Sequence, residues 1–321
     1  MLSNAEPYIL VTGAAGFIGS HLCEALLGQD IRIIGLDNLN DYYDSNLKLA
    51  NINLLLEEKG FQFAKGDIRD SDLVSSIFQK WNVKSVVHLA AMVGVRNSID
   101  NPQEYVDVNI GGLTNVLMHA AKHNVTNFIF ASSSSVYGNR SKVPFKEDDI
   151  TDFPFSPYAA TKKAGESLVY TFHSLYGIPS TCLRFFTVYG PRGRPDMATY
   201  KFISRIHKGL AIPQFGDGTS ARDYTYVLDT VKGIVASLNK PHDYEIYNLG
   251  GSHPVTLSSY IHLIEKVVGK EAIIEQHDDQ MGDVVLTYAD ISKAQKDLGY
   301  RPSYDLEKGL EETFKWYLAR Y

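Results

Sequence analysis

Short apolar runs alternate with helical patterns along the first 187 residues of the chain. The runs have the length of strands, and alternation of this kind predicts a parallel sheet covered by helices on both faces. Expected strands cover residues 8–13, 31–37, 61–67, 84–91, 127–133 and 180–186. Expected helices between them include residues 20–27, 70–80 and 102–123.

The first expected strand runs directly into a glycine-rich loop and then into a helix. The loop has the spacing G-x-x-G-x-x-G. Gly13 allows a tight turn, Gly16 lets the backbone approach a pyrophosphate, and Gly19 lets the helix pack closely on the strand. The start of the helix then faces the phosphates. A plain strand–helix turn can also contain three glycines, but a strand before the loop and a helix after it favour a dinucleotide site and a Rossmann-type, doubly wound α/β fold.

An acidic residue, Asp37, ends the second expected strand. A carboxylate there accepts hydrogen bonds from the adenosine ribose and repels a 2′-phosphate, which favours NAD over NADP. The alternative is a solvated turn aspartate. Further cofactor contacts are expected from position alone, near the adenine edge at Asp67 and beneath the cofactor at Leu89, Ala90 and Ala91.

The pattern changes after residue 187. We expect a smaller, mostly helical, substrate-binding region that closes over the C-terminal edge of the sheet. Helical stretches are expected at residues 196–209, 227–239, 256–268 and 306–320, and one more strand at 245–250. The expected division is 1–187 for the NAD-binding domain and 188–321 for the discontinuous second region, with segments such as 227–250 returning to the first.

The composition excludes several classes of protein. A formal net charge of −6 argues against a nucleic-acid partner, since phosphate recognition needs a basic face. No run is apolar enough to span a bilayer, and no charged leader with a long apolar core precedes the first strand, so a cytoplasmic location is expected. Cys23 and Cys182 are expected to be buried, reduced thiols. None of the ten histidines has a metal-ligand spacing, so no metal is expected.

A tyrosine and a lysine four residues apart, Tyr158 and Lys162, open an expected helix after the fifth strand. The spacing puts the phenol and the ammonium on one face of that helix. The pKa of a free phenol is about 10, but a nearby ammonium and a positive nicotinamide favour the phenolate. The pair predicts an acid/base tyrosine whose lysine also holds the nicotinamide ribose. Such pairs are common on helix surfaces, and the position after the fifth strand is what favours catalysis.

The fifth expected strand ends in a run of serines. Ligands bind outside the carboxyl ends of parallel strands, so a hydroxyl here can bond the reacting oxygen of a substrate beside the tyrosine. A serine run can also be a flexible linker, but the flanking segments NFIFA and VYG argue against one. The run consists of Ser132, Ser133, Ser134 and Ser135.

Four segments together resemble the extended short-chain dehydrogenase/reductases that act on nucleotide sugars. They are TGAAGFIG at the glycine loop, SSSSVYG after the fifth strand, YAATK at the tyrosine–lysine pair, and the later ARDYTYV. Three further segments, LDNLNDYYD, FFTVYGPRGRPDMA and GDVVLTYADISKAQKDLGY, most resemble UDP-glucuronate 4-epimerases. The resemblance covers essentially the whole chain.

The resemblance implies roles for individual residues. It makes Ser133 the hydroxyl partner of Tyr158 and Arg222 the arginine that binds the diphosphate. Gln280 stands where galactose-type epimerases have a second diphosphate arginine, so part of that contact is unassigned. Further contacts are expected from Phe17, Ile18, Asn38, Asn40, Ile68 and Asn109 to the cofactor and from Lys201 to the substrate.

Two of the serines depart from a related pattern. Ser134 and Ser135 stand where the sugar 4,6-dehydratases of this family have an Asp-Glu pair. Dehydration needs an acid and a base to expel the C6 hydroxyl, and two serines cannot easily supply them. The resemblance therefore implies a reaction other than dehydration.

The implied reaction is NAD-dependent 4-epimerisation of a UDP-hexuronic acid, from UDP-glucuronate to UDP-galacturonate. Tyr158 takes the proton of the sugar 4-hydroxyl, C4 is oxidised, the 4-keto sugar turns over, and C4 is reduced from its other face. A UDP-glucuronate decarboxylase is an alternative, because the 4-keto glucuronate is a β-keto acid, and so is a neutral-sugar 4-epimerase. Outside enzymes, the alternative is a dinucleotide-sensing protein, but loss of the tyrosine or lysine would mark one, and both are present.

Two residues after the sixth strand, Thr187 and Arg194, are expected to hold the sugar carboxylate. Galactose-type epimerases have asparagine where Thr187 stands. A guanidinium pairs with a carboxylate through two parallel hydrogen bonds, which fixes the plane of the carboxylate. For Arg192, in the same loop, a solvated charge is an equal alternative. The resemblance favours Arg194, which it places over the pocket.

Two expected helices have apolar residues at helical spacing, a pattern that most often marks a core face. The resemblance implies that the outer faces of both helices pair across a two-fold axis as a four-helix bundle, which predicts a homodimer. The residues are Val106, Ile110, Leu113 and Leu117 in 102–123, and Leu168, Phe172 and Leu175 in 157–176.

Overall fold

A seven-stranded parallel sheet forms the centre of the molecule. The computed structural model describes residues 6–280 and 282–321. The strand order is β10-β6-β5-β4-β1-β2-β3, and each neighbouring pair is parallel, which confirms the Rossmann-type fold. The strands are β1 (Tyr8–Thr12), β2 (Ile33–Asp37), β3 (Phe61–Lys65), β4 (Val83–His88), β5 (Asn127–Ser133), β6 (Ser180–Phe185) and β10 (Tyr244–Leu249).

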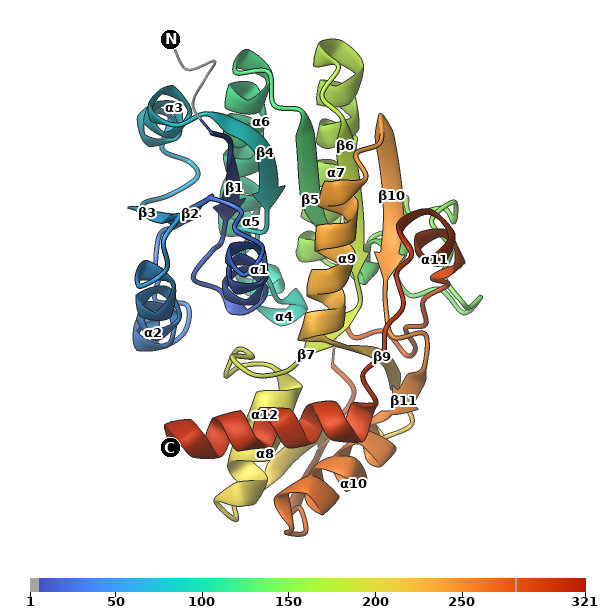
Figure 1. Cartoon of the computed structure of the whole chain (residues 1–321). Coiled ribbons are helices and arrows are strands. Elements are labelled where there is room, and N and C mark those ends of the chain that lie inside the picture. The colour runs from blue at the N-terminus through green and yellow to red at the C-terminus, as the bar shows by residue number, and fades with distance from the viewer. Residues whose placement is uncertain (1–5, 281) are drawn as a thin grey trace.

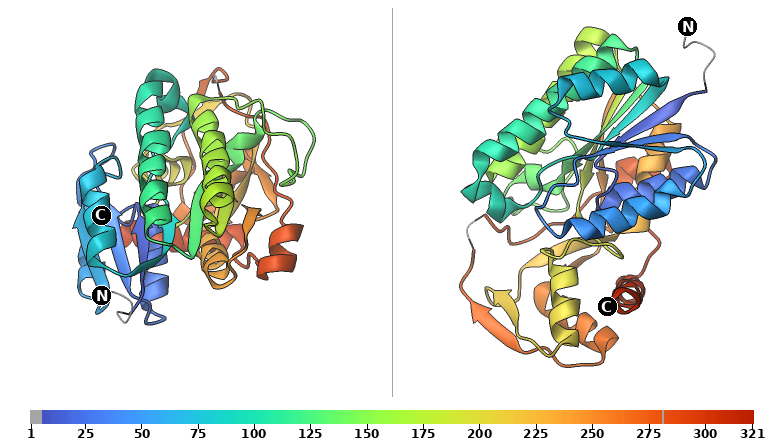
Figure 2. Two further views of the ribbon diagram at one scale, coloured as in Figure 1. Left: turned by 90° about the horizontal axis from the view of Figure 1, so that it is seen from above. Right: turned by 90° about the vertical axis from the view of Figure 1, so that its left-hand side faces the viewer.

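Helices cover both faces of this sheet, and each face has its own buried apolar core. Figures 1 and 2 show the two layers on opposite sides of the strands. One layer contains α1 (Phe17–Leu27), α2 (Ser45–Leu56), α9 (Val227–Asn239) and α11 (Ser292–Leu298). The other contains α3 (Ser71–Lys80), α6 (Leu113–Lys122) and α7 (Pro157–Tyr176).

The helix expected over residues 102–123 is interrupted. The segment consists of α5 (Pro102–Val106), a π-helical turn η1 (Asp107–Gly112) and α6, and it follows the short helix α4 (Val95–Asp100). A Cβ at Gly112 would lie 2.5 Å from Ile68 Cδ1, so a larger residue there would require the Ile68 side chain to move. After β5 the chain makes one 3₁₀ turn, η2 (Ser134–Tyr137).

A smaller lobe lies beyond the C-terminal edge of the sheet (Figure 1). The sequence predicted a mostly helical region, and the lobe also contains two small sheets. Its core is formed by side chains such as Phe202, Tyr260 and Leu310. Its elements are β7 (Thr187–Tyr189), α8 (Ala198–His207), β8 (Ile212–Phe215), β9 (Ala221–Tyr226), β11 (Pro254–Thr256), α10 (Leu257–Val268), β12 (Ile274–His277) and α12 (Leu306–Arg320).

Chain segments cross between the two parts. After β9, α9 packs on α1 and β10 joins the edge of the large sheet beside β6. Cys23 and Cys182 are free and buried. Among the described residues, no helix combines the length and the apolar character needed to cross a membrane.

Candidate active site

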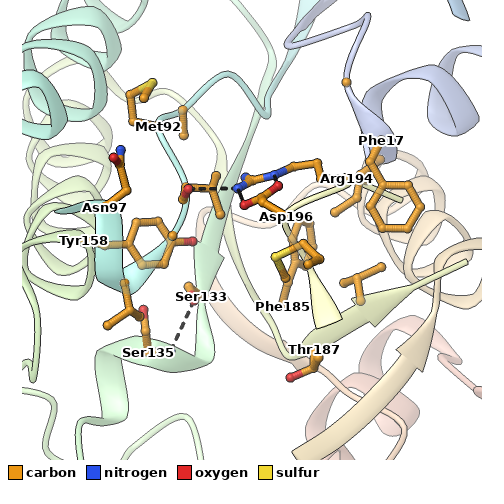
Figure 3. A pocket seen from close by; sticks show the side chains of 18 of the residues that line it. Phe17, Met92, Asn97, Ser133, Ser135, Tyr158, Phe185, Thr187, Arg194 and Asp196 are labelled. Atoms are coloured by element: carbon orange, nitrogen blue, oxygen red, sulfur yellow. Dashed lines mark hydrogen bonds and ion pairs between the residues drawn. The ribbon is translucent and has the colours of Figure 1, made fainter. Parts of the chain in front are cut away.

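One large cavity, of about 730 Å³, lies between the C-terminal edge of the sheet and the smaller lobe. It joins the glycine loop, the ends of β2, β4, β5 and β6, and the loop before α8. Of the site residues expected from the sequence, all but Asn109 and Gln280 line it. Figure 3 shows Tyr158 and Ser133 on one side of the cavity, with Arg194 and Phe17 on the other.

The glycine loop is tightly packed on one side and open on the other. Gly13 has φ +74°, and a Cβ there would lie 2.8 Å from the nitrogen of Ala90. A Cβ at Gly19 would lie 2.1 Å from the carbonyl oxygen of Gly13. Gly16 is the N-cap of α1, which has no side-chain cap and no acidic residue in its first turn. The first N–H groups of this helix therefore suit an anionic ligand at the cavity.

Asp37 lies at the end of β2, where the sequence predicted it. Its carboxylate accepts hydrogen bonds from the backbone nitrogens of Ala15 (3.0 Å) and Leu39 (2.8 Å). Burial raises the pKa of Asp37, while these two bonds and the nearby Lys48 act in the opposite direction. The carboxylate is thus held in a fixed orientation at the cavity wall.

Lys48 is a cavity residue that sequence reasoning missed. It lies on α2, a helix that was not predicted, and its ammonium donates to the carbonyl (2.9 Å) and side-chain (2.5 Å) oxygens of Asn40. Burial lowers its pKa. No pattern in the sequence indicates this buried cation, because its partner Asn40 lies in an irregular loop.

Asp67 is more constrained than its expected role at the adenine edge requires. The Arg69 guanidinium binds both of its oxygens, at 2.9 and 2.8 Å, and the Asn38 amide donates to one of them at 3.0 Å. The Arg69 hydrogen bonds lower the pKa of Asp67 to about 2. The carboxylate is therefore ionised at the cavity wall.

Asn109 and Gln280 lie outside the cavity wall. The Asn109 amide accepts from the backbone nitrogen of Met92 (2.7 Å) and donates to the Met92 carbonyl and the Thr161 hydroxyl (3.0 Å each). It fixes the loop after β4 against α7. The Gln280 side-chain oxygen is buried and has no hydrogen-bond partner among the described residues.

Tyr158 and Lys162 lie on the first turns of α7, which Ser156 caps by accepting from Ala159 N at 3.1 Å. Burial raises the pKa of the Tyr158 phenol, while a hydrogen bond from Ser133 and the charge of Arg194 lower it. The Lys162 ammonium donates to the Ala131 carbonyl at 2.8 Å, and burial lowers its pKa to about 7. The sequence predicted that the lysine would lower the phenol pKa. In the structure Lys162 instead faces a carbonyl and lies 6.0 Å from the ring centre.

The serine run places hydroxyls beside the phenol. Ser133 accepts a hydrogen bond from Ser135 N at 3.2 Å at the start of the 3₁₀ turn. The Ser135 hydroxyl is buried and has no partner among the described residues. Ser134 and Thr187 also line the cavity. The site thus has several hydroxyls within it, and no carboxylate at positions 134 and 135.

The two arginines of the loop after β7 differ in surroundings. Arg192 has φ +63°, donates to Glu24 on α1 at 2.6 Å and does not line the cavity. Arg194 lines the cavity, but its Nε and Nη2 both bind Asp196, at 3.0 and 2.5 Å, and Nη2 also donates to the Val93 carbonyl. Only Nη1 has no partner in these contacts, so the two-bond grip expected for a substrate carboxylate is already made to Asp196.

Arg222 lines the cavity from β9, as does Lys201 from α8. The next residue, Asp223, is fully buried and accepts hydrogen bonds from the nitrogens of Gly251 (2.8 Å) and Ala289 (2.9 Å). These bonds fix the strand that presents Arg222. A second cation at this end, Arg96 of α4, was missed by sequence reasoning. Its guanidinium pairs with the Asp283 carboxylate at 3.0 Å. The surrounding segment VRNSI contains no motif that indicates a cation at the cavity.

No group of three or more His, Cys, Asp or Glu side chains is arranged to hold a metal within the described residues.

Comparisons with known proteins agree with this geometry. The family model described as GDP-mannose 4,6 dehydratase matches residues 10–313. A UDP-glucuronate 4-epimerase of Thermodesulfobacterium geofontis (strain OPF15) is 46% identical over 310 residues, which are 96% of this chain and 95% of that protein.

Solved structures show the same similarity. The UDP-glucuronic acid 4-epimerase from Bacillus cereus, in complex with UDP-glucuronic acid and NAD, has a TM-score of 0.93 and 40% identity, covering 98% of this chain and 100% of that one. The UDP-glucose 4-epimerase of Thermotoga maritima, with UDP-glucose, has a TM-score of 0.90 and 32% identity, covering 98% and 99%. The chain therefore belongs to the GDP-mannose 4,6 dehydratase family, among the extended short-chain dehydrogenase/reductases.

Proposed function

We propose that this chain is an NAD-dependent UDP-glucuronate 4-epimerase, which interconverts UDP-glucuronate and UDP-galacturonate. The observation that supports it best is that Tyr158 and Ser133 line the same cavity as the dinucleotide loop, with Tyr158 buried. The serines at positions 134 and 135 argue against dehydration despite the family's description. Of the relatives named above, the Thermodesulfobacterium geofontis protein is a UDP-glucuronate 4-epimerase, and the Bacillus cereus enzyme was solved with UDP-glucuronic acid and NAD.

The residues fit NAD at the glycine loop. Gly13 and Gly19 have no room for side chains, the start of α1 is uncapped, and Asp37 faces the cavity. NAD bound at this loop would supply reversible hydride transfer at C4 of the sugar. Lys162 lies beneath the same region, where its ammonium can hold the nicotinamide ribose.

The proton chemistry falls to this chain's own residues. Tyr158 removes the proton of the sugar 4-hydroxyl as a general base and returns it as a general acid. Ser133 bonds the same oxygen and orients it toward the phenol.

The hexuronate preference rests on the polar groups around the sugar end of the cavity. Ser134, Ser135 and Thr187 offer hydroxyls to a carboxylate, and Arg194 offers one guanidinium nitrogen. The Arg194–Asp196 pair also favours a second candidate, a neutral-sugar 4-epimerase. Asp196 neutralises the positive charge of Arg194, which would otherwise attract the carboxylate of a hexuronate.

Product analysis separates these candidates. The protein is incubated separately with UDP-glucuronate, UDP-glucose and UDP-N-acetylglucosamine, and products are identified by chromatography and mass. We expect UDP-galacturonate from UDP-glucuronate and little conversion of the other two. Release of carbon dioxide with a UDP-pentose would instead indicate a decarboxylase, and faster turnover of UDP-glucose would indicate the neutral-sugar enzyme.

The cofactor preference gives a direct test. We expect NAD to co-purify with the protein, and NADP to bind much more weakly, because the Asp37 carboxylate repels a 2′-phosphate. Calorimetry on protein stripped of its nucleotide compares the two. Equal affinity for NAD and NADP would contradict this role of Asp37. In an Asp37→Asn variant, the affinities for the two nucleotides should be closer to each other.

We also propose a cytoplasmic homodimer. Leu113 and Leu117 of the predicted stripe are core residues, but Val106 and Leu175 are exposed. Together with other exposed apolar side chains, they support pairing of the outer faces of α5–α6 and α7. The additional exposed residues are Met118, Tyr170 and Tyr176. Two free, buried cysteines are consistent with a reducing compartment. Light scattering at micromolar concentration should give twice the chain mass, and a monomer mass would exclude the dimer.

A further inference from the structure

Three consecutive residues at the end of β5 face three side chains of α7, and two of these pairs are hydrogen-bonded. The Ala131 carbonyl accepts from Lys162 at 2.8 Å, and the Ser132 hydroxyl donates to Glu166 Oε1 at 2.6 Å. The next residue along, Ser133, lines the same cavity as Tyr158 and lowers the pKa of its phenol. Because the three α7 residues are four apart in sequence, they share one face of the helix. Successive residues at the end of β5 thus each contact a side chain on this face of α7.

The hydrogen bonds of Glu166 continue from α7 into the buried part of the sheet. Its two carboxylate oxygens bind Arg184 Nε and Nη2, at 2.8 and 2.9 Å, and both side chains are only 2% exposed. Arg184 also donates to the Tyr137 hydroxyl at 2.9 Å, and Tyr137 donates to Asn248 at 2.7 Å.

This polar chain runs straight across three strands. Ser132, Arg184 and Asn248 are aligned in register on β5, β6 and β10. They lie one residue before the catalytic end of β5. Breaking such a buried pair is costly, but apolar residues of similar volume can often replace it without loss of stability. Stability alone therefore does not explain it, whereas fixed geometry at the end of β5 does.

We infer that Ser132 and Glu166 are positioning residues, which set the approach of Ser133 to Tyr158 by fixing the end of β5 against α7 and β6. The inference rests on the proposed role of Tyr158 as the acid/base. Neither residue touches the reacting atoms in this assignment. Each acts by fixing the backbone that positions Ser133 beside Tyr158.

The expected consequence concerns ionisation of the phenol. The charged or titratable groups that face Tyr158 are Lys162 on its own helix, Arg194 from the loop after β7, and Tyr105 of α5, whose ring is 6.2 Å away. The Ser133 hydrogen bond lowers the phenol pKa. Loosening that bond should therefore raise the pKa and move the acid limb of activity to higher pH.

The deciding experiment uses Ser132→Ala, which removes the hydrogen bond from Ser132 to Glu166 and leaves the Glu166–Arg184 pair intact. We expect kcat to fall by about 3- to 10-fold, the size of one lost hydrogen bond, with KM and bound NAD within about two-fold of the original. The matched control is Ser237→Ala, which removes another fully buried serine bond, to the Gly233 carbonyl (2.9 Å), on α9. It should leave kcat and the pH profile unchanged.

A second measurement is independent of turnover. Titration of ¹³Cζ-labelled tyrosines by NMR, with Tyr158→Phe to identify the signal, reports the phenol directly in NAD-loaded protein. Its pKa should rise in Ser132→Ala and not in Ser237→Ala. An unchanged phenol pKa and kcat in Ser132→Ala would overturn the positioning role. If Tyr158→Phe is fully active, the proposed function fails instead, whatever the titration shows.

The ion pair is tested with a neutral replacement, Glu166→Gln with Arg184→Met, which avoids an unpaired buried charge. We expect this double variant to fold with near-original thermal stability but to show the kcat loss and raised phenol pKa of Ser132→Ala. Full activity in the stable double variant would contradict the positioning role of Glu166. If it does not fold, Ser132→Ala still decides.

Discussion

Replacing Tyr158 with phenylalanine is expected to lower kcat on the preferred UDP-sugar by about 100-fold or more, because general acid–base catalysis contributes an effect of that order. The substitution removes only the phenolic oxygen. The ring, its edge-on contact with Tyr105 and the fold of α7 should be retained. NAD content and the KM for the sugar nucleotide should therefore change little. The measurement is initial-rate kinetics with bound NAD quantified in parallel.

The role of Tyr158 also predicts how activity depends on pH. Burial raises the pKa of Tyr158, so the phenolate fraction, and with it kcat/KM, should increase with pH along the acid limb. Residual activity of Tyr158→Phe should lack that limb. Tyr176→Phe, on the same helix but 59% exposed, serves as the control and should keep the original profile. Turnover by Tyr158→Phe within a few-fold of the original would refute the acid/base role.

The sheet and glycine loop could be predicted because their signals are local. A strand, three glycines at fixed spacing and a helix lie within twenty residues, and Asp37 ends the next strand. The same holds for Tyr158 and Lys162, whose spacing places them on one helix face. Helix α2, with apolar residues on several sides, gave no clear periodic pattern and was not predicted.

Side-chain partners could not be predicted, because they depend on how distant segments meet. Asn109 was expected at the cofactor, but the structure uses its amide to join the loop after β4 to α7. Lys162 was expected to act on the phenol, and its ammonium faces the Ala131 carbonyl. Glu166 and Arg184 meet only because strand register brings β6 beside the serine run. Composition and spacing contain no information on these contacts.

The second large effect is expected at Arg194. Charge-assisted hydrogen bonds contribute roughly 1.5–3 kcal/mol each, so Arg194→Ala should weaken use of UDP-glucuronate by about 10- to 150-fold. The structure limits the contact that is lost. With Nε and Nη2 bound to Asp196, and Nη2 also to the Val93 carbonyl, the guanidinium can offer only Nη1 to a substrate carboxylate. A loss near the upper end of that range would imply that Asp196 releases the arginine when substrate binds.

The comparison of two substrates separates recognition from damage. Arg194 also contacts the Tyr42 ring at 5.0 Å and the loop after β4, so its removal could disturb the cavity for any sugar nucleotide. UDP-glucose has no carboxylate, and its binding should be far less affected. Equal loss for both substrates, or unchanged activity on UDP-glucuronate, would make the carboxylate assignment wrong. Arg192→Ala is the matched control, since Arg192 pairs with Glu24 outside the cavity.

The products of Arg194→Ala test a further consequence. A β-keto carboxylate loses carbon dioxide most easily when its breaking bond aligns with the ketone π system, so a residue that holds the carboxylate away from alignment protects the intermediate. Without Arg194, a fraction of turnovers should therefore release a UDP-pentose and carbon dioxide, measured by mass spectrometry. Thr187 and Ser135 would still contact the carboxylate, so we expect epimerisation to continue alongside this decarboxylation. A variant that loses rate but releases no UDP-pentose would show that Arg194 contributes to binding and not to protection of the keto acid.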